Sequence, residues 1–258
     1  MSLPCPSTSC PEMRQRGVLG IDQLATTLSK GGRSFTLRVE ALELVSGEVL
    51  CVTGASGTGK TLFLELLSLL RAPEPPARYR WTDLDLRQTD LARLWLSGPR
   101  GTGLARMRGA LFGFVPQAGA LVPFLSVRAN VALTQEISGR RDPARVAALL
   151  DRLGLTALAD LPPSALSIGQ RQRVSIARAL AHCPAFVIAD EPTAALDPDA
   201  ADAVMQLLLD TAREDGAGVV LSSHDLARVE RLGTRRLEFV ARELRPGLVR
   251  SEAREVGC

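Results

Sequence analysis

The sequence GASGTGKT, residues 54–61, follows the apolar run Val49–Thr53 and precedes a segment with helical spacing. It matches the pattern G-x4-G-K-[S/T], in which glycines let backbone N–H groups surround phosphate oxygens. The lysine at position 60 can reach the β- and γ-phosphates, and the threonine hydroxyl at position 61 can bind Mg²⁺. A loop of this kind between a buried strand and a helix predicts a nucleoside triphosphate site in an α/β fold.

All eight residues of this loop are predicted nucleotide contacts: Gly54, Ala55, Ser56, Gly57, Thr58, Gly59, Lys60 and Thr61. Lys60 is also assigned a catalytic role, because its ammonium group reaches the β- and γ-phosphates. It is one of two lysines beside 29 arginines among the 31 basic residues. A compact point charge suits a tight phosphate loop better than the planar fork of arginine does. Lys30, the other lysine, has no comparable assignment.

The composition is that of a folded globular chain, with 46% hydrophobic and 23% charged residues in a length of 258. That length fits one large domain or two small lobes around a shared core. The net charge of +3 is too small for a surface that coats nucleic acid, and seven Phe, two Trp and one Tyr offer few platforms for bases. No nucleic-acid partner is therefore expected.

Residues 1–17 form a Pro- and Ser-rich leader that we expect to be flexible, and residues 18–258 form the expected domain. The leader lacks the hydrophobic core of a signal peptide. No apolar run reaches the roughly 20 residues that span a bilayer. The five cysteines are scattered, and the apolar surroundings of Cys51 and Cys183 predict core thiols rather than a disulfide framework. These features predict a cytoplasmic protein.

Strand-like and helical segments alternate along the chain. Expected strands cover residues 35–44, 49–53, 79–86, 111–115, 185–189 and 219–222, and expected helices cover residues 61–70 and 199–214. Helical spacing also runs through residues 127–158, with breaks at Gly139 and Gly154. This alternation predicts an α/β sheet with right-handed crossovers. A helical subdomain is expected over approximately residues 118–182.

A second motif, FVIADE at residues 186–191, is an apolar strand that ends in two carboxylates. At the exit of a buried strand beside the phosphate loop, Asp190 is placed to bind Mg²⁺ through its water shell. Glu191 is placed to orient and deprotonate the attacking water. Alone, such a pair could equally be a solvated strand end. The phosphate loop upstream favours the catalytic interpretation.

A third motif, LSIGQRQRVSIARAL at residues 166–180, lies just before that carboxylate strand. Ser167 can cap a helix whose first turn contains Gly169 and Gln170, so its free N–H groups would form another anion-binding end. On spacing alone, a plain capped amphipathic helix is the simpler interpretation.

Read in order, these motifs resemble those of the ATP-binding-cassette (ABC) ATPases, the nucleotide-binding subunits of ABC transporters. GASGTGKT is similar to their Walker A motif, LSIGQ to their signature, and FVIADE to Walker B with its catalytic glutamate. Gln117 is similar to the Q-loop glutamine, AALD at residues 194–197 to the D-loop, and Ser223-His224-Asp225 to the switch-histidine loop. The resemblance implies a P-loop NTPase fold: a RecA-like parallel sheet core, an antiparallel β subdomain and an inserted α-helical signature subdomain.

The resemblance also implies ATP and Mg²⁺ as cofactors, bound in a head-to-tail dimer between the Walker A of one subunit and the signature of the other. Ser167 and Gly169 would then contact the γ-phosphate in trans, and Gln117 would touch Mg²⁺ and sense an integral membrane permease. His224 would hold the γ-phosphate and the attacking water. The residues so implied are Glu191, His224 and Lys60 for catalysis, Thr61, Gln117 and Asp190 for the metal, and Gln117, Ser167, Gly169, Gln170 and Asp197 as further nucleotide contacts.

Within the superfamily, residues 106–133 are similar to the lipoprotein-releasing, macrolide-exporter and cell-division group typified by LolD, MacB and FtsE. In that group an Arg-rich helix precedes a Gly-Phe-Val-x-Gln strand. A Pro and then an Asn-Val helix follow this strand. Importers share much of this segment, so the sequence leaves the direction of transport and the cargo open.

Three positions depart from the family pattern. Ile168 occupies a signature position that usually holds glycine, and its β-branched side chain could alter the γ-phosphate contact or slow turnover. Ala194 replaces the common D-loop serine and removes a hydroxyl. No aromatic residue is an obvious adenine platform, since the alternation around Phe35 predicts a core strand. Weak adenine selectivity and a stack supplied by Arg33 are the two options that remain.

The sequence thus predicts an ATP-hydrolysing subunit that drives a separately encoded permease, peripheral on the inner face of a bacterial cell membrane. One alternative is a soluble ABC ATPase in DNA repair or translation. A single cassette without a heptad arm or a CxxC pair argues against it. A second alternative, motivated by Ile168 and Ala194, is a hydrolysis-impaired regulatory cassette.

Overall fold

A computed structural model describes residues 16–117 and 120–256. Its strands are Gly17–Lys30 (β1), Arg33–Val45 (β2), Val49–Thr53 (β3), Arg78–Asp83 (β4), Gln88–Asp90 (β5), Phe112–Val115 (β6), Phe186–Ala189 (β7), Gly218–Ser222 (β8), Arg235–Arg245 (β9) and Leu248–Val256 (β10). Its α-helices are Lys60–Leu67 (α1), Thr102–Leu111 (α2), Val127–Ser138 (α3), Pro143–Arg152 (α4), Ile168–Leu180 (α5), Pro198–Asp215 (α6) and Leu226–Leu232 (α7). Three short 3₁₀ helices span Arg93–Ser97, Thr156–Leu158 and Pro163–Ala165.

The strands form one mixed sheet in the order β5-β4-β1-β2-β10-β9-β3-β8-β7-β6. Strands β9, β3, β8, β7 and β6 pair in parallel, whereas β1, β2, β4 and β5 pair antiparallel. Every residue of β7 and β8 is buried, as expected for strands covered on both faces. The predicted fold, a parallel core with an antiparallel arm and a helical insertion, is confirmed, and the two β parts belong to one continuous sheet.

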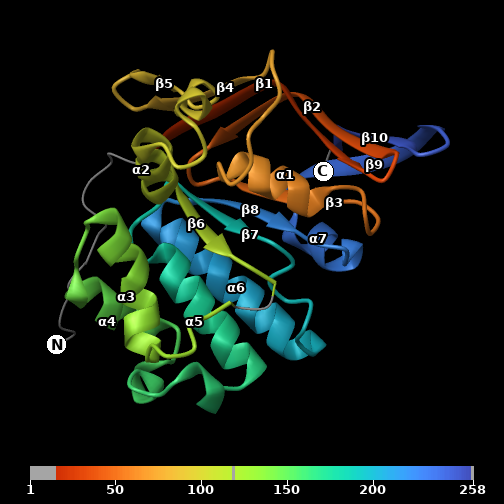
Figure 1. Cartoon of the computed structure of the whole chain (residues 1–258). Helices are drawn as coiled ribbons and strands as arrows, with labels where there is room; N and C mark the ends of the chain where they lie inside the picture. The colour runs from red at the N-terminus through yellow and green to blue at the C-terminus, as the bar shows by residue number, and fades with distance from the viewer. Residues whose placement is uncertain (1–15, 118–119, 257–258) are drawn as a thin grey trace.

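Helix α1 lies between the antiparallel strands and the parallel strands (Figure 1). One apolar cluster joins it to both sides, since it unites Leu24 and Leu37 of the antiparallel arm with Phe63 and Leu67 of the helix. The ring centroids of Phe63 and Phe239 on β9 are 5.2 Å apart. The helix that follows the phosphate loop is therefore fixed by packing on two sides.

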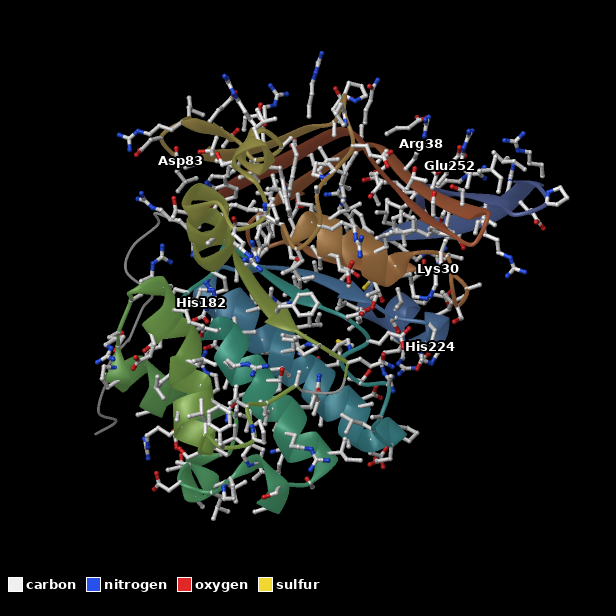
Figure 2. The ribbon with its side chains drawn as sticks, in the orientation of Figure 1. Lys30, Arg38, Asp83, His182, His224 and Glu252 are labelled. Atoms are coloured by element: carbon white, nitrogen blue, oxygen red, sulfur yellow. The ribbon has the colours of Figure 1, made fainter. Side chains whose placement is uncertain are left out.

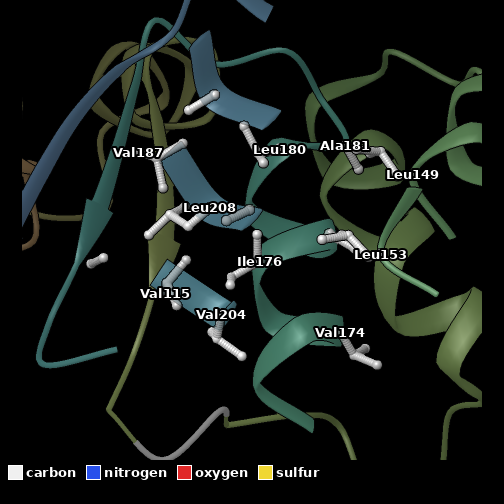
Figure 3. Packing of buried hydrophobic residues seen from close by; sticks show 14 of the residues in the cluster. Val115, Leu149, Leu153, Val174, Ile176, Leu180, Ala181, Val187, Val204 and Leu208 are labelled. Carbon is white, nitrogen blue, oxygen red and sulfur yellow. The ribbon is translucent and has the colours of Figure 1, made fainter. Parts of the chain in front are cut away.

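Helices α3 to α6 gather on the other side of the parallel strands (Figure 1), where a second apolar cluster holds them. Figure 3 shows Val115 and Val187 of the sheet beside Val204 of α6 and Ile176 of α5. At Gly113 of β6 an added Cβ would lie 2.1 Å from the carbonyl oxygen of Ala179. The end of α5 therefore lies directly against the sheet.

The helix expected over residues 61–70 ends earlier than predicted, at Leu67. Leu69 adopts a left-handed φ of 59°, and its N–H bonds the carbonyl of Leu66 while that of Leu70 bonds the carbonyl of Glu65. This Schellman arrangement terminates the helix before the prolines at residues 73–76 are reached. A glycine normally marks such an end, and a leucine gives no warning in the sequence.

The strand expected over residues 79–86 is also shorter, since β4 ends at Asp83. The side chain of Asp83 accepts the N–H of Arg87 at 2.9 Å, which closes a turn into β5. Strands β1, β9 and β10 were not among the expected elements. Residues 1–15, most of the expected leader, lie outside the described residues, and Gly17 already belongs to β1.

The buried side chain of Arg145 connects α4 with α5 and α6. Arg145 on α4 forms a salt bridge with Asp215 at the end of α6, where its Nη1 lies 3.1 Å from Oδ1. Arg145 also donates to the carbonyl of Leu180 at 2.9 Å.

His182 is 3% exposed, and its Nε2 lies 3.1 Å from the carbonyl oxygen of Phe112. Its Nδ1 has no hydrogen-bond partner among the described residues.

The expectation of two free core thiols is half correct. Cys51 is free and buried, and burial raises the pKa of its thiol. Cys183 is disulfide-bonded, so the expectation for it is wrong. Within residues 16–117 and 120–256, no helix is long and apolar enough to cross a membrane.

Candidate active site

The phosphate loop joins β3 to α1, as predicted. Gly54 has a φ of 141°, and a Cβ there would lie 2.6 Å from the carbonyl oxygen of Phe239. Only glycine fits this position, because the loop passes directly against the backbone of β9. Gly59 caps α1 without any side-chain hydrogen bond. The N–H groups of the first turn are therefore free to face an anion.

Lys60 is 7% exposed and folds back over its own loop. Its Nζ donates to the carbonyl oxygens of Gly54 at 2.8 Å and Ala55 at 3.2 Å. The same nitrogen lies 3.9 Å from Oε1 of Glu191. The ammonium group is thus held where the loop carbonyls and the predicted catalytic carboxylate meet.

The two carboxylates follow β7, next to the phosphate loop. The N–H of Asp190 donates to the carbonyl of Val115 at 2.9 Å, which continues the pairing of β7 with β6. Thr61 Oγ1 donates to Asp190 Oδ2 at 2.8 Å. Glu191 adopts a φ of 44°, a left-handed conformation that is unusual for a residue other than glycine. The chain turns sharply at Glu191, directly after the residue that faces the phosphate loop.

Three side chains from separate elements converge on the carboxylate of Glu191. Gln117, after β6, places its Nε2 3.4 Å from Oε2, and His224, after β8, places its Nδ1 3.4 Å from the same oxygen. Lys60 approaches the other oxygen. The side chain of Glu191 is 22% exposed and that of His224 is 64% exposed. The structure therefore brings four predicted catalytic and sensing residues together.

The two histidines lie at opposite ends of the parallel strands. His224 follows the end of β8, whereas His182 precedes the start of the parallel strand β7, and Figure 2 shows them well apart. A cavity of about 200 Å³ lies beside Glu191 and His224. It is lined by Glu191, Thr193, Ala194, Leu196, Pro198, Ser223, His224, Asp225 and Arg228.

The chemistry of these side chains fits the predicted metal. Mg²⁺ prefers oxygen ligands, and the hydroxyl of Thr61 and a carboxylate oxygen of Asp190 already meet at 2.8 Å. The amide of Gln117 reaches the neighbouring carboxylate of Glu191. Oxygen ligands from two elements, α1 and the end of β7, therefore meet beside the phosphate loop, and the amide nitrogen of Gln117 lies next to them.

The signature residues form a separate group. Ser167 and Gln170 make a capping box, in which the Ser167 hydroxyl accepts the N–H of Gln170 at 3.2 Å and the Gln170 side chain accepts the N–H of Ser167 at 2.8 Å. Among the described residues, neither side chain bonds to the phosphate loop. An added Cβ on Gly169 would lie 3.7 Å from Leu196, in the predicted D-loop. Asp197 caps α6 by accepting the N–H of Ala200 at 3.0 Å.

The residues that depart from the family pattern are accessible or close to the loop. Ile168 is 51% exposed at the start of α5. Phe35 is half-buried in β2, as its alternation predicts, and its ring lies 3.2 Å from the point where a Gly59 Cβ would stand. The sequence thus placed Phe35 in the correct element without showing that it touches the phosphate loop.

Two serines near the site were not predicted. Ser222, at the end of β8, donates its hydroxyl to Asp190 Oδ1 at 2.6 Å. Ser251, buried on β10, donates to the carbonyl of Thr58 at 2.6 Å. Ser222 could have been noticed as a polar residue directly before Ser223-His224. Nothing in the sequence connects Ser251 with a loop 193 positions away.

A phosphate loop between β3 and α1, with paired carboxylates after β7, a parallel strand separated from β3 by β8 alone, defines a P-loop nucleoside triphosphatase. Residues 37–194, more than half of the chain, match the family model described as ABC transporter. The chain belongs to the ABC transporter family, and within it is an ATPase subunit. The predicted family resemblance is confirmed.

Two curated relatives come from different transport systems. It is 38% identical over 219 residues to the lipoprotein-releasing system ATP-binding protein LolD 1 of Rhodospirillum rubrum, covering 80% of this chain and 92% of the relative. It is 38% identical over 188 residues to the macrolide export ATP-binding/permease protein MacB 2 of Aeromonas hydrophila subsp. hydrophila, covering 72% of this chain and 27% of the relative.

A solved structure agrees with the fold. The ATP-binding cassette MJ0796, as a dimer in a post-hydrolysis state bound to ADP and Pi, is similar with a TM-score of 0.73 and 31% identity. The similarity covers 93% of this chain and 98% of that chain.

Proposed function

We propose that this ATPase subunit binds ATP with Mg²⁺ and works as a head-to-tail dimer on the cytoplasmic face of the membrane, where it drives a separately encoded permease of the lipoprotein-release or mechanotransmission type. The observation that carries the proposal is the convergence of Lys60, Gln117 and His224 on Glu191, beside the Thr61–Asp190 contact. These side chains come from four elements and meet at one end of the phosphate loop.

Each side chain has a defined task in hydrolysis. Lys60 and the free N–H groups of α1 hold the β- and γ-phosphates. Glu191 takes a proton from water as the water oxygen attacks the γ-phosphorus and the bond to the leaving ADP oxygen breaks. His224, 3.4 Å from Glu191, lies where it can hold a γ-phosphate oxygen and the same water. Thr61 and Asp190 would hold Mg²⁺, which neutralises charge on the phosphates when it is bound.

The subgroup assignment rests on two observations. The chain spans 92% of the length of its lipoprotein-releasing relative. It spans 27% of the macrolide exporter, whose printed name combines the ATP-binding and permease parts.

The dimer proposal explains the separate signature group. The capping box uses the N–H groups of Ser167 and Gln170 and leaves those of Ile168 and Gly169, in the first turn of α5, to face an anion. A second subunit in the opposite orientation would bring a bound triphosphate to this helix end. Asp197, in the neighbouring D-loop, would then lie at the same junction.

The test is the Glu191→Gln variant, assayed for ATP binding, for phosphate release and for dimer mass by light scattering. We expect phosphate release to fall by about 10²–10⁴-fold while ATP binding persists and the dimer accumulates. Glu230→Gln, which changes a carboxylate on α7, is the matched control and should behave as the unmodified protein. Unchanged phosphate release in Glu191→Gln would exclude Glu191 as the base.

The permease assignment needs its own measurement. In a pull-down, the Glu191→Gln variant loaded with ATP and Mg²⁺ should recover a four-span membrane protein with a large extracytoplasmic domain. Recovery of a six-span permease would favour an importer, and recovery of ribosomes or DNA would favour a soluble ABC ATPase.

A hydrolysis-impaired regulatory cassette is the alternative that two residues favour. Ile168 places an exposed apolar side chain at the helix end where a glycine is usual, and Ala194 removes a hydroxyl from the D-loop. Sustained ATP turnover in the presence of the permease would exclude this alternative. Restored turnover in Ile168→Gly, from a slow parent, would support it.

A further inference from the structure

Ser222 is a buried polar residue at the end of an apolar strand. It closes β8, whose preceding residues Gly218–Leu221 are all buried, and it is itself 0% exposed. It pairs with Val52 of β3, while Leu221 pairs with Ala189 of β7. Ser222 therefore lies between the phosphate-loop strand and the carboxylate strand, level with the point where both strands end.

The hydroxyl of Ser222 uses both of its hydrogen-bonding functions on the carboxylate pair. The N–H of Glu191 donates to Oγ at 2.8 Å. Because that N–H can only donate, the single hydroxyl proton is free for Asp190 Oδ1, 2.6 Å away. Ser175, also fully buried, shows the contrast, since its hydroxyl has no partner among the described residues.

These two bonds determine how the carboxylate pair is presented. Asp190 has Oδ1 bound to Ser222, so Oδ2 is the oxygen that faces Thr61 and the phosphate loop. Glu191 has a left-handed φ of 44°, which costs free energy for a residue with a Cβ. The hydrogen bond from its N–H to Ser222 holds the backbone in that conformation. One hydroxyl thus orients both acids.

We propose that Ser222 is a positioning residue for ATP hydrolysis, which sets the metal-facing oxygen of Asp190 and the backbone turn at Glu191. This inference rests on the proposed function, because it needs a metal at Asp190 and a base at Glu191. Partners of metal-binding carboxylates typically change metal affinity or activity by about 10–100-fold when they are removed.

The experiment compares Ser222→Thr with Ser222→Val, two side chains of the same shape that differ in the hydroxyl. The first readout is Mn²⁺ binding to the protein loaded with ADP, followed by the electron paramagnetic resonance signal of free Mn²⁺. We expect about tenfold weaker binding for Ser222→Val and nearly unchanged binding for Ser222→Thr. The second readout is steady-state hydrolysis at saturating Mg²⁺, where kcat should fall in Ser222→Val while KM for ATP changes little.

Two further variants separate the possible outcomes. Ser175→Ala removes a buried hydroxyl elsewhere and should change neither readout. Ser222→Ala replaces Ser222→Val if circular dichroism shows that the valine variant is unfolded. Equal Mn²⁺ affinity and equal kcat in the threonine variant and the hydroxyl-free variant would overturn the inference.

Asp190→Asn distinguishes failure of the inference from failure of the proposed function. If Asp190→Asn loses Mn²⁺ binding and turnover while Ser222→Val retains both, the inference alone is wrong. If Asp190→Asn retains both, the proposed metal site is wrong, and the positioning role of Ser222 falls with it.

Discussion

His182 makes the stability of the fold depend on pH, and the size of the effect follows from its surroundings. Burial, together with Arg140 and Arg145 nearby, lowers the pKa of His182 from 6.5 to about 4. The carbonyl of Phe112 accepts from Nε2, so the neutral ring keeps its proton there and leaves Nδ1 without a partner. Protonation of Nδ1 would bury a second N–H and a positive charge beside two guanidinium groups.

The sign follows from linkage. In the unfolded chain His182 takes up a proton near pH 6.5, whereas in the folded chain it does so only near pH 4. Stability is therefore fully present above pH 6.5 and is lost as pH falls from 6.5 to about 4. The two pKa values correspond to a loss of about 2.5 kcal/mol in unfolding free energy at pH 4.5.

The assay is urea unfolding at pH 7 and pH 4.5, followed by circular dichroism, for the unmodified protein and His182→Gln. The glutamine amide can still donate to the carbonyl of Phe112 but does not titrate. We expect His182→Gln to lose about 2.5 kcal/mol less than the unmodified protein between the two pH values. His224→Gln, which changes the exposed histidine, should keep the full loss. Equal losses in His182→Gln and the unmodified protein would refute the reasoning.

Two further predictions concern stability and the phosphate loop. Arg145→Met should lower the unfolding free energy by about 3–5 kcal/mol, because Asp215 is left buried without its partner; adding Asp215→Leu should recover most of the loss in urea unfolding. Gly54→Ala should destabilise the fold by more than the roughly 1–3 kcal/mol of a strained φ alone, since its Cβ would meet the carbonyl oxygen of Phe239, and it should weaken nucleotide binding. Gly57→Ala, with a φ of 79° and open space around its Cβ, should cost only the strain, and equal unfolding free energies for the two alanine variants would contradict this account.

The parallel half of the fold was predictable because its signals are local. Continuous apolar runs identified β3, β7 and β8, and the breaks at Gly139 and Gly154 separated the helices. Gly139 does adopt the left-handed conformation that ends α3.

The antiparallel half was harder to predict, because its apolar alternation is interrupted. In β1 the buried positions are 17, 19 and 21 and then 24 and 26, so the alternation shifts by one residue at Gln23, where φ is 55°. Strand β9 carries arginines and glutamates on its exposed face, which resembles a solvated helix as much as a strand. Period-2 patterns of this kind are visible only once the pairing partner is known.

The candidate site divides in the same way. Lys60, Asp190 and Glu191 lie in motifs that can be read from a few consecutive residues. The roles of Ser222 and Ser251 depend on contacts across 32 and 193 residues of sequence, which no local pattern records. The sequence motifs therefore predicted the reacting groups, and the structure was needed to identify the side chains that position them.

The position of the last two strands has a consequence for synthesis on the ribosome. Strands β9 and β10 stand in the middle of the sheet, between β2 and β3, although they are made after all the other described strands. Until they emerge, the edges of β2 and β3 have no neighbour on that side, and Thr58 lacks the Ser251 hydroxyl. We expect the nascent chain to expose open strand edges to aggregation and to gain nucleotide binding only after residue 251 has left the exit tunnel.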